Sequence, residues 1–186
     1  MKELKDYSGP FIPNVKYEDF SKEVLTKLLK AYCREVLVID AYWQGQVRKR
    51  LGDEVVRECL HANWTRIAKH EMGWAMEAAN IEGNDVETYC KVCQLIGSFA
   101  QDYYNYEFDL KSRNHAIMTV HECPAFTAME KGDPEWLDWT CKVLEFEVIK
   151  AYVAVINPAI KVKCLRAGQR SSPSEPACQW EFKLGQ

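Results

Sequence analysis

Cys123 is the residue in this sequence that is best placed to do chemistry. It follows an alternating stretch typical of a β-strand and precedes Pro124, which suits the first position of a helix because no free N–H is needed there. A thiol at a helix start faces the positive end of the peptide dipoles, which lowers its pKa and stabilises the thiolate. We therefore predict that Cys123 is a nucleophile or metal ligand, with His121 as a nearby proton carrier. The alternative is a buried cysteine that only caps the helix.

Cys141 and Glu145 stand four residues apart in a long predicted helix and should therefore share one face. A thiolate and a carboxylate on one face can bind a metal together, or the carboxylate can act as base for the thiol. Cys178 opens the last predicted strand, and the alternation there turns its side chain inward. We predict one catalytic or metal site, with zinc as the favoured ion, formed by Cys123, Cys141, Glu145 and Cys178. The alternative is an ion-paired Glu145 beside cysteines that belong to the core.

The other cysteines fit established motifs less well. Cys164 also points inward by alternation and could complete a four-thiolate zinc site, but such sites normally contain a close Cys-x-x-Cys pair. The one such pair, Cys90 and Cys93, falls inside a predicted helix with no strand before it. Redox enzymes need that motif at a helix start, so we interpret this pair as packing.

Several polar side chains interrupt the apolar faces of the N-terminal helices. A buried carboxylate costs several kcal/mol unless it is paired or bound to a metal. These positions can therefore pair with arginines or the backbone, or they can meet as the floor of a pocket. The predicted pocket residues are Asp40, Trp43, Asn63, His70 and Glu71.

The helices that position these residues fill the first half of the chain. Residues 1–17 are predicted to be an irregular arm, and residues 18–100 to be helical. A helix should begin at Ser21 as N-cap, with a bend near Tyr32-Cys33, and Gly52 should end the segment that follows. Further helices are expected over 53–79 and 86–99, on the 3.6-residue period of their apolar residues.

The second half changes period and is predicted to form the sheet. Alternating residues predict strands over 104–110, 115–121, 160–164 and 178–184, with helices over 124–132 and 134–156 between them. We therefore expect an α+β fold, in which an N-terminal helical half packs with an antiparallel sheet of about four strands. Residues 103–184 hold the sheet with its two inserted helices, and residues 1–186 should form a single domain.

Composition narrows the functional classes. The net charge is −3 with both signs interspersed, so no basic surface for nucleic acid is expected. No apolar run approaches the ~20 residues of a membrane-spanning helix. The charged N-terminus lacks the apolar stretch of a signal peptide, and the 8 cysteines are expected to be reduced, which favours the cytoplasm. A homodimer is compatible with the many aromatic residues.

Several of these stretches together resemble an uncharacterised prokaryotic family that is common in anaerobes. The resemblance is carried by Tyr17–Lys22, Asp40-x-x-Trp43, Gly83–Asp85, Asn114–Ile117, Cys123-Pro124, Cys141-x-x-x-Glu145, Asn157-Pro158 and Cys178–Phe182. That family is similar in layout to the L-2-amino-thiazoline-4-carboxylic acid hydrolases. More distantly, the closing hairpin resembles the vinyl-4-reductase domain, which binds small molecules. The resemblance maps the family's cysteine and glutamate positions onto Cys123, Cys141, Glu145 and Cys178.

Two functions follow as hypotheses. The first is a hydrolase-like cytoplasmic enzyme that acts on a small sulfur- or nitrogen-containing molecule through a cysteine- or metal-centred pocket. The second is a non-catalytic module that binds a hydrocarbon-like ligand or a metal. Both require Cys123 and the Cys141–Glu145 pair to face the same enclosed space.

Overall fold

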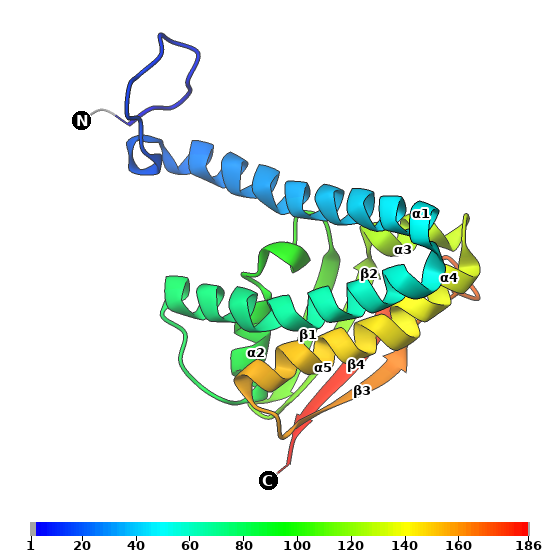
Figure 1. Cartoon of the computed structure of the whole chain (residues 1–186). Coiled ribbons are helices and arrows are strands. Elements are labelled where there is room, and N and C mark those ends of the chain that lie inside the picture. Colours follow the sequence, from blue (N-terminus) through cyan, green and yellow to red (C-terminus); the bar gives the residue numbers. More distant parts are fainter. Residues whose placement is uncertain (1–2, 186) are drawn as a thin grey trace.

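The helical half of the chain is built on α1 (Lys22–Ala79), which reverses direction at Gly52, as Figure 1 shows. The computed structural model describes residues 3–185. Gly52 has a φ of 86°, a conformation that glycine adopts without strain, so the predicted helix end there is confirmed. The predicted bend near Tyr32-Cys33 is wrong. The helix continues through that point, where no glycine or proline interrupts it.

The rest of the helical half is short. Asp85 caps α2 (Val86–Cys93), because its side chain accepts a hydrogen bond of 2.8 Å from the Thr88 N–H. The helix ends before the predicted residue 99, and a separate 3₁₀ turn (Gly97–Phe99) follows. This turn brings Ser98 against the second half of α1, where Glu71 accepts its backbone N–H.

The sheet contains four antiparallel strands in the order β1-β2-β4-β3. The strands are β1 (Asn105–Ser112), β2 (His115–Glu122), β3 (Ile160–Arg166) and β4 (Cys178–Leu184). Its inner face is apolar and buried, with Ala116, Met118, Trp180 and Phe182 each at most 4% exposed. The helical N-terminal half and this sheet confirm the predicted α+β class.

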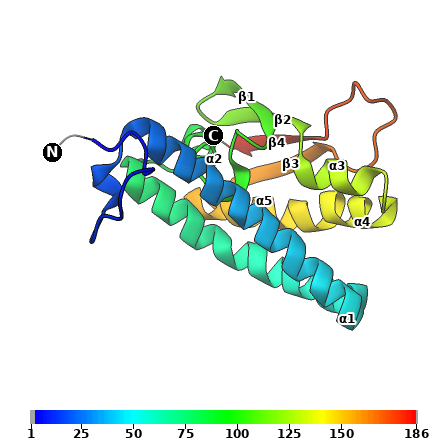
Figure 2. The same ribbon diagram turned by 90° about the horizontal axis from the view of Figure 1, so that it is seen from above.

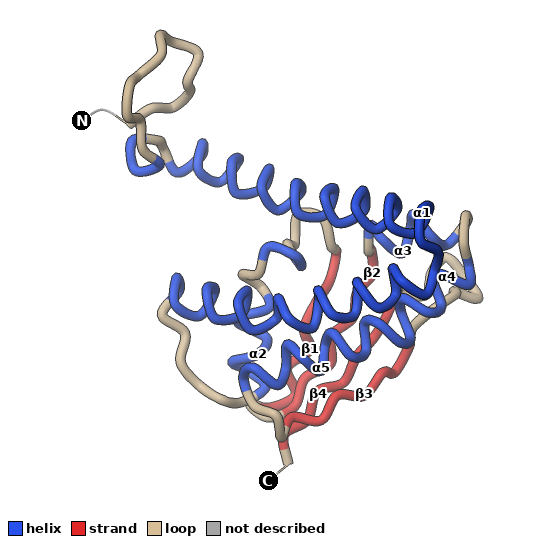
Figure 3. Tube along the Cα trace, in the orientation of Figure 1, coloured by secondary structure: helices blue, strands red, loops and turns tan. Residues whose placement is uncertain are grey.

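Three further helices connect β2 to β3. They are α3 (Pro124–Glu130), α4 (Pro134–Trp139) and α5 (Glu145–Ile156). A π-helical turn (Thr140–Leu144) joins α4 to α5, so the single helix predicted over 134–156 is widened in the middle. Figures 2 and 3 show α5 between the sheet and the second half of α1. No helix within residues 3–185 is long and apolar enough to cross a membrane.

Candidate functional site

The main cavity of the protein has a volume of about 660 Å³ and lies between the sheet, α3, α5 and the first half of α1. Most of its lining is aromatic or aliphatic, including Trp64, Phe99, Phe126, Trp136 and Trp180. Exposed lining residues, such as Val38 on α1 and Ala128 on α3, mark a mouth between these two helices. We call the α3, α5 and strand side of the cavity the sheet-side wall, and residues 37–48 of α1 the helix-side wall.

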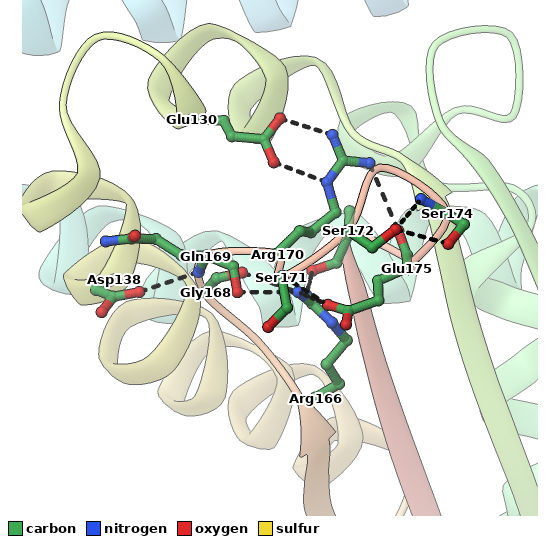
Figure 4. Close-up of polar contacts among 11 residues, drawn as sticks. Glu130, Asp138, Arg166, Gly168, Gln169, Arg170, Ser171, Ser172, Ser174 and Glu175 are labelled. Carbon is green, nitrogen blue, oxygen red and sulfur yellow. Dashed lines mark hydrogen bonds and ion pairs between the residues drawn. The ribbon is translucent and has the colours of Figure 1, made fainter.

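Polar contacts of the loop between β3 and β4 hold the sheet-side wall in place (Figure 4). Arg170 donates two hydrogen bonds, of 2.7 and 2.6 Å, to the carboxylate of Glu130 at the end of α3. Its guanidinium also lies 4.9 Å from the ring centre of Phe126, a residue of the cavity wall. Arg166 donates a 2.7 Å hydrogen bond to the Ala177 carbonyl, directly before Cys178. The loop therefore anchors both α3 and the start of β4.

The four residues predicted as one catalytic or metal site all line this cavity: Cys123, Cys141, Glu145 and Cys178. They come from separate elements, namely the start of α3, the π-helical turn, the first position of α5 and the start of β4. Cys123 caps α3 as expected, because its sulfur accepts the Phe126 N–H at 3.4 Å. The structure thus brings together the side chains on which both functional hypotheses depend.

The pKa of Cys123 is raised rather than lowered, so the thiolate predicted there finds no support in the structure. Burial raises the pKa of Cys123 to about 11, although the N–H groups of Phe126 and Ala125 act in the opposite direction. Burial, with the neighbouring Glu145 charge, likewise raises the pKa of Cys141 to about 12. The pKa of Cys178 is raised as well, again mainly by burial. Desolvation therefore outweighs the helix start, and the thiols are neutral near pH 7.

Among the described residues of the sheet-side wall, Glu145 has a carboxyl group without a hydrogen-bond or ion-pair partner. Burial, followed by repulsion from Asp40, raises its pKa to about 7. Within residues 3–185, no hydrogen-bond donor or cation contacts its carboxylate. The Glu145 side chain is half-buried and lines the cavity. The adjacent π-helical turn is a type of irregularity that is frequent at functional sites.

Asp40 faces the cavity from the helix-side wall. Its two oxygens accept hydrogen bonds from Trp43 Nε1 at 3.0 Å and from the Gln44 side chain at 2.9 Å. Both donors are neutral and lie on the first half of α1, and Trp64 on the second half of α1 also acts on Asp40 as a neutral donor. Burial raises the pKa of Asp40, and these hydrogen bonds act against that shift. Neutral donors from both halves of α1 therefore stabilise the carboxylate.

A second hollow, the side groove, has a volume of about 560 Å³ and runs between the two halves of α1. Four of the five predicted pocket residues line it: Asp40, Trp43, Asn63 and Glu71. Glu71 accepts hydrogen bonds from the Ser98 hydroxyl at 2.7 Å and the Tyr152 hydroxyl at 2.6 Å, so it braces the fold. The fifth, His70, is absent from the lining of both hollows and lies beside Trp74, with ring centres 5.6 Å apart.

The structure separates His121 from the thiols. Its ring contacts Glu107 at 3.2 Å on the outer face of the sheet, and it does not line the cavity. Cys164 is half-buried and is also outside the lining. No three His, Cys, Asp or Glu side chains of residues 3–185 are grouped so that they could hold a metal ion. The zinc site therefore stays a prediction without structural support.

Tyr104 and Thr140 are two polar residues of the lining that were not among the predicted site residues. Tyr104 lies just before β1 and lines the cavity. Burial raises the pKa of its phenol, and the neighbouring thiols and carboxylates of the cavity raise it further. It begins the inward series continued by Tyr106 and Phe108, so its position was a possible signal. Thr140 starts the π-helical turn, and its buried hydroxyl oxygen has no hydrogen-bond partner among the described residues. Helical periodicity alone does not reveal such a turn.

Comparisons with known proteins place the chain by family. No curated protein matches it. Among solved structures, a trafficking protein particle complex subunit 3 from Naegleria fowleri, covalently bound to palmitic acid, is similar over 89% of this chain and 98% of that chain, at 13% identity and a TM-score of 0.42. The resemblance to thiazoline hydrolases finds no support in these comparisons. A model of a family of unknown function (DUF6125) matches residues 18–184, and the chain therefore belongs to that family.

Proposed function

We propose that this protein binds an apolar small molecule in the main cavity and does not transform it. The observation that carries the proposal is the cavity itself, because its volume of about 660 Å³ falls within the range of roughly 300–1,000 Å³ typical of small-molecule sites. A well-packed interior has few voids larger than a water molecule. An apolar hollow of this size therefore favours an occupant that replaces the missing side-chain contacts.

The state of the thiols also supports binding over catalysis. With a pKa of about 11, only roughly one Cys123 thiol in ten thousand is ionised at pH 7. A neutral thiol is a poor nucleophile and a poor metal ligand, but it packs well against hydrocarbon. Cys123, Cys141 and Cys178 then act as part of the apolar lining.

A fluorescent probe can test this proposal. N-phenyl-1-naphthylamine is neutral at pH 8 and becomes bright in apolar surroundings, so it should bind the native protein and fluoresce. Gly45→Trp should weaken this binding at least tenfold, because Gly45 lines the cavity near its mouth and a side chain there meets open space. The variant should still fold, since replacing a helical glycine does not lower helix propensity.

Gly73→Trp provides the matched control. Gly73 lies in the second half of the same helix, it also has open space around an added Cβ, and it is absent from the lining of both hollows. We expect this variant to bind the probe as the unmodified protein does. Equal binding by Gly45→Trp and Gly73→Trp, or no binding by the unmodified protein, would overturn the proposal.

A cysteine hydrolase is the second candidate, and one observation favours it. Cys123 and Glu145 are close enough for the Glu145 charge to act on the thiol, and a carboxyl group with a pKa near 7 is suited to general base catalysis. Iodoacetamide labelling of the native protein across pH distinguishes the candidates. A binding protein should show Cys123 labelled no faster than an ordinary thiol, whereas a hydrolase requires faster labelling near pH 7.

We further propose that the protein works in the cytoplasm. All 8 cysteines are free, including the exposed Cys59, which suits a reducing compartment. The homodimer stays a prediction. Exposed apolar residues on α1, such as Leu29, Ile39 and Tyr42, give it a surface to use.

A further inference from the structure

The charges around the main cavity are unbalanced. Among the described residues, four charged side chains line it: Asp40, Arg48, Asp133 and Glu145. Arg48 is already paired, because its guanidinium lies 2.7 Å from Asp133 and 2.8 Å from Asp53. It also stacks on Trp136, with the guanidinium carbon 4.1 Å from the ring centre. Asp40 and Glu145 therefore face the cavity without a cationic partner, because the one cation among these lining residues, Arg48, is paired with Asp53 and Asp133.

The two carboxyl groups differ in how far their own chain satisfies them. Asp40 accepts hydrogen bonds from Trp43 and Gln44 on its own helix. Glu145 lies opposite on the sheet-side wall, where it is half-buried and accepts no hydrogen bond from the described residues. A carboxyl group that is partly removed from water and has no partner is costly, so a ligand that pairs with Glu145 gains the interaction that the fold does not provide.

The aromatic residues of the lining favour the same type of ligand group. Trp64, Phe99 and Tyr104 line the cavity together with the two carboxyl groups. The faces of aromatic rings attract cations, and this attraction strengthens when water is excluded. An anionic head group would instead meet two acidic side chains at short range, and like charges in such surroundings repel strongly.

We propose that the ligand is a cationic amphiphile, a hydrocarbon that carries a protonated amine, and that Glu145 is the residue that pairs with the amine. This inference rests on the proposed function and assigns the chemical class of the ligand. The hydrocarbon part occupies the apolar lining, and the ammonium group lies between Glu145 and Asp40. A fatty acid, which has the same apolar part but the opposite charge, is disfavoured.

Three ligands with the same ten-carbon chain test this inference: decylamine, 1-decanol and decanoate, each titrated into the native protein by calorimetry at pH 8. We expect decylamine to bind most tightly, about tenfold to a hundredfold more tightly than decanol, which is the gain from one charge-assisted hydrogen bond. Decanoate should bind most weakly. Glu145→Gln should bind decylamine no more tightly than it binds decanol, so that the advantage of the amine over the alcohol is lost.

Glu147→Gln is the control, because it makes the same change on the same helix at an exposed residue that pairs with Lys150 and lies outside the cavity. It should keep the preference for the amine. If decanol binds but decylamine has no advantage, or decanoate binds most tightly, the inference fails and the proposed function survives. If none of the three binds, both fail. The comparison of ligands on the unmodified protein decides the matter even if Glu145→Gln does not fold.

Discussion

The two walls of the main cavity are built in opposite ways. The sheet-side wall consists of α5, the strands and α3, and the Arg170–Glu130 pair holds α3 in place. It carries Cys123, Cys141, Cys178 and Glu145. The helix-side wall is one helix that exposes many of its apolar residues, with Val38 at 41% and Ile39 at 55%. Its acidic residue, Asp40, accepts hydrogen bonds from Trp43 and Gln44 on that helix, and Trp64 on the second half of α1 also acts on it as a donor. We infer that the sheet-side wall binds the polar group of the ligand and that the helix-side wall covers its hydrocarbon part.

Matched leucine truncations should separate the walls most strongly. Leu144 on the sheet-side wall is 4% exposed, whereas Leu37 on the helix-side wall is half-buried, and both line the cavity. We expect Leu144→Ala to lower the free energy of unfolding by about 2–5 kcal/mol. Leu37→Ala should cost only about 1 kcal/mol, because it removes fewer contacts. Urea unfolding measures both, and equal losses would remove the distinction between the walls.

The second effect concerns how Glu145 links stability to pH. Its pKa is raised from 4.5 to about 7 in the folded chain, so its protonated form favours folding. The stabilisation is complete below about pH 4.5 and is lost as the pH rises through 7. Between pH 4.5 and 8 the unmodified protein should therefore lose about 3 kcal/mol more unfolding free energy than Glu145→Gln, which cannot ionise.

Urea unfolding of both proteins at several pH values gives this difference directly, since all other titrating groups are common to the two. Glu147→Gln, on the exposed side of α5, should follow the unmodified protein at every pH. Parallel curves for Glu145→Gln and the unmodified protein would mean that Glu145 has a solvated carboxyl group. The sheet-side wall would then be as open as the helix-side wall.

The fold could be predicted largely from the sequence because its signals are local. Gly52 ends a helical segment, Pro124 begins one, and the alternation around Tyr106 and Trp180 marks strands. The convergence of Cys123 with Glu145 was also predictable, since a strand, a helix start and a helix face each have a defined direction. That the residues form a single domain stays a prediction.

The chemistry of the site could not be predicted in the same way, because it depends on what surrounds each group. The dipole argument at Cys123 is sound, but the sequence does not show that the thiol is enclosed, and burial is the larger effect on its pKa. His121 follows Val120 on the same strand, and alternation alone already turns it to the outer face. The π-helical turn at Thr140 depends on packing against neighbouring elements, which no local pattern records.

Native mass spectrometry of the protein, purified gently and without detergent, tests most directly whether the cavity holds an apolar molecule. We expect a folded chain that carries one small organic molecule, which is released on denaturation to leave the unmodified mass of the chain. Gly45→Trp should carry less of this molecule than Gly73→Trp does. An empty folded chain, equal occupancy in the two variants, or a mass that stays attached to a cysteine after denaturation would contradict reversible binding in a cavity of neutral thiols.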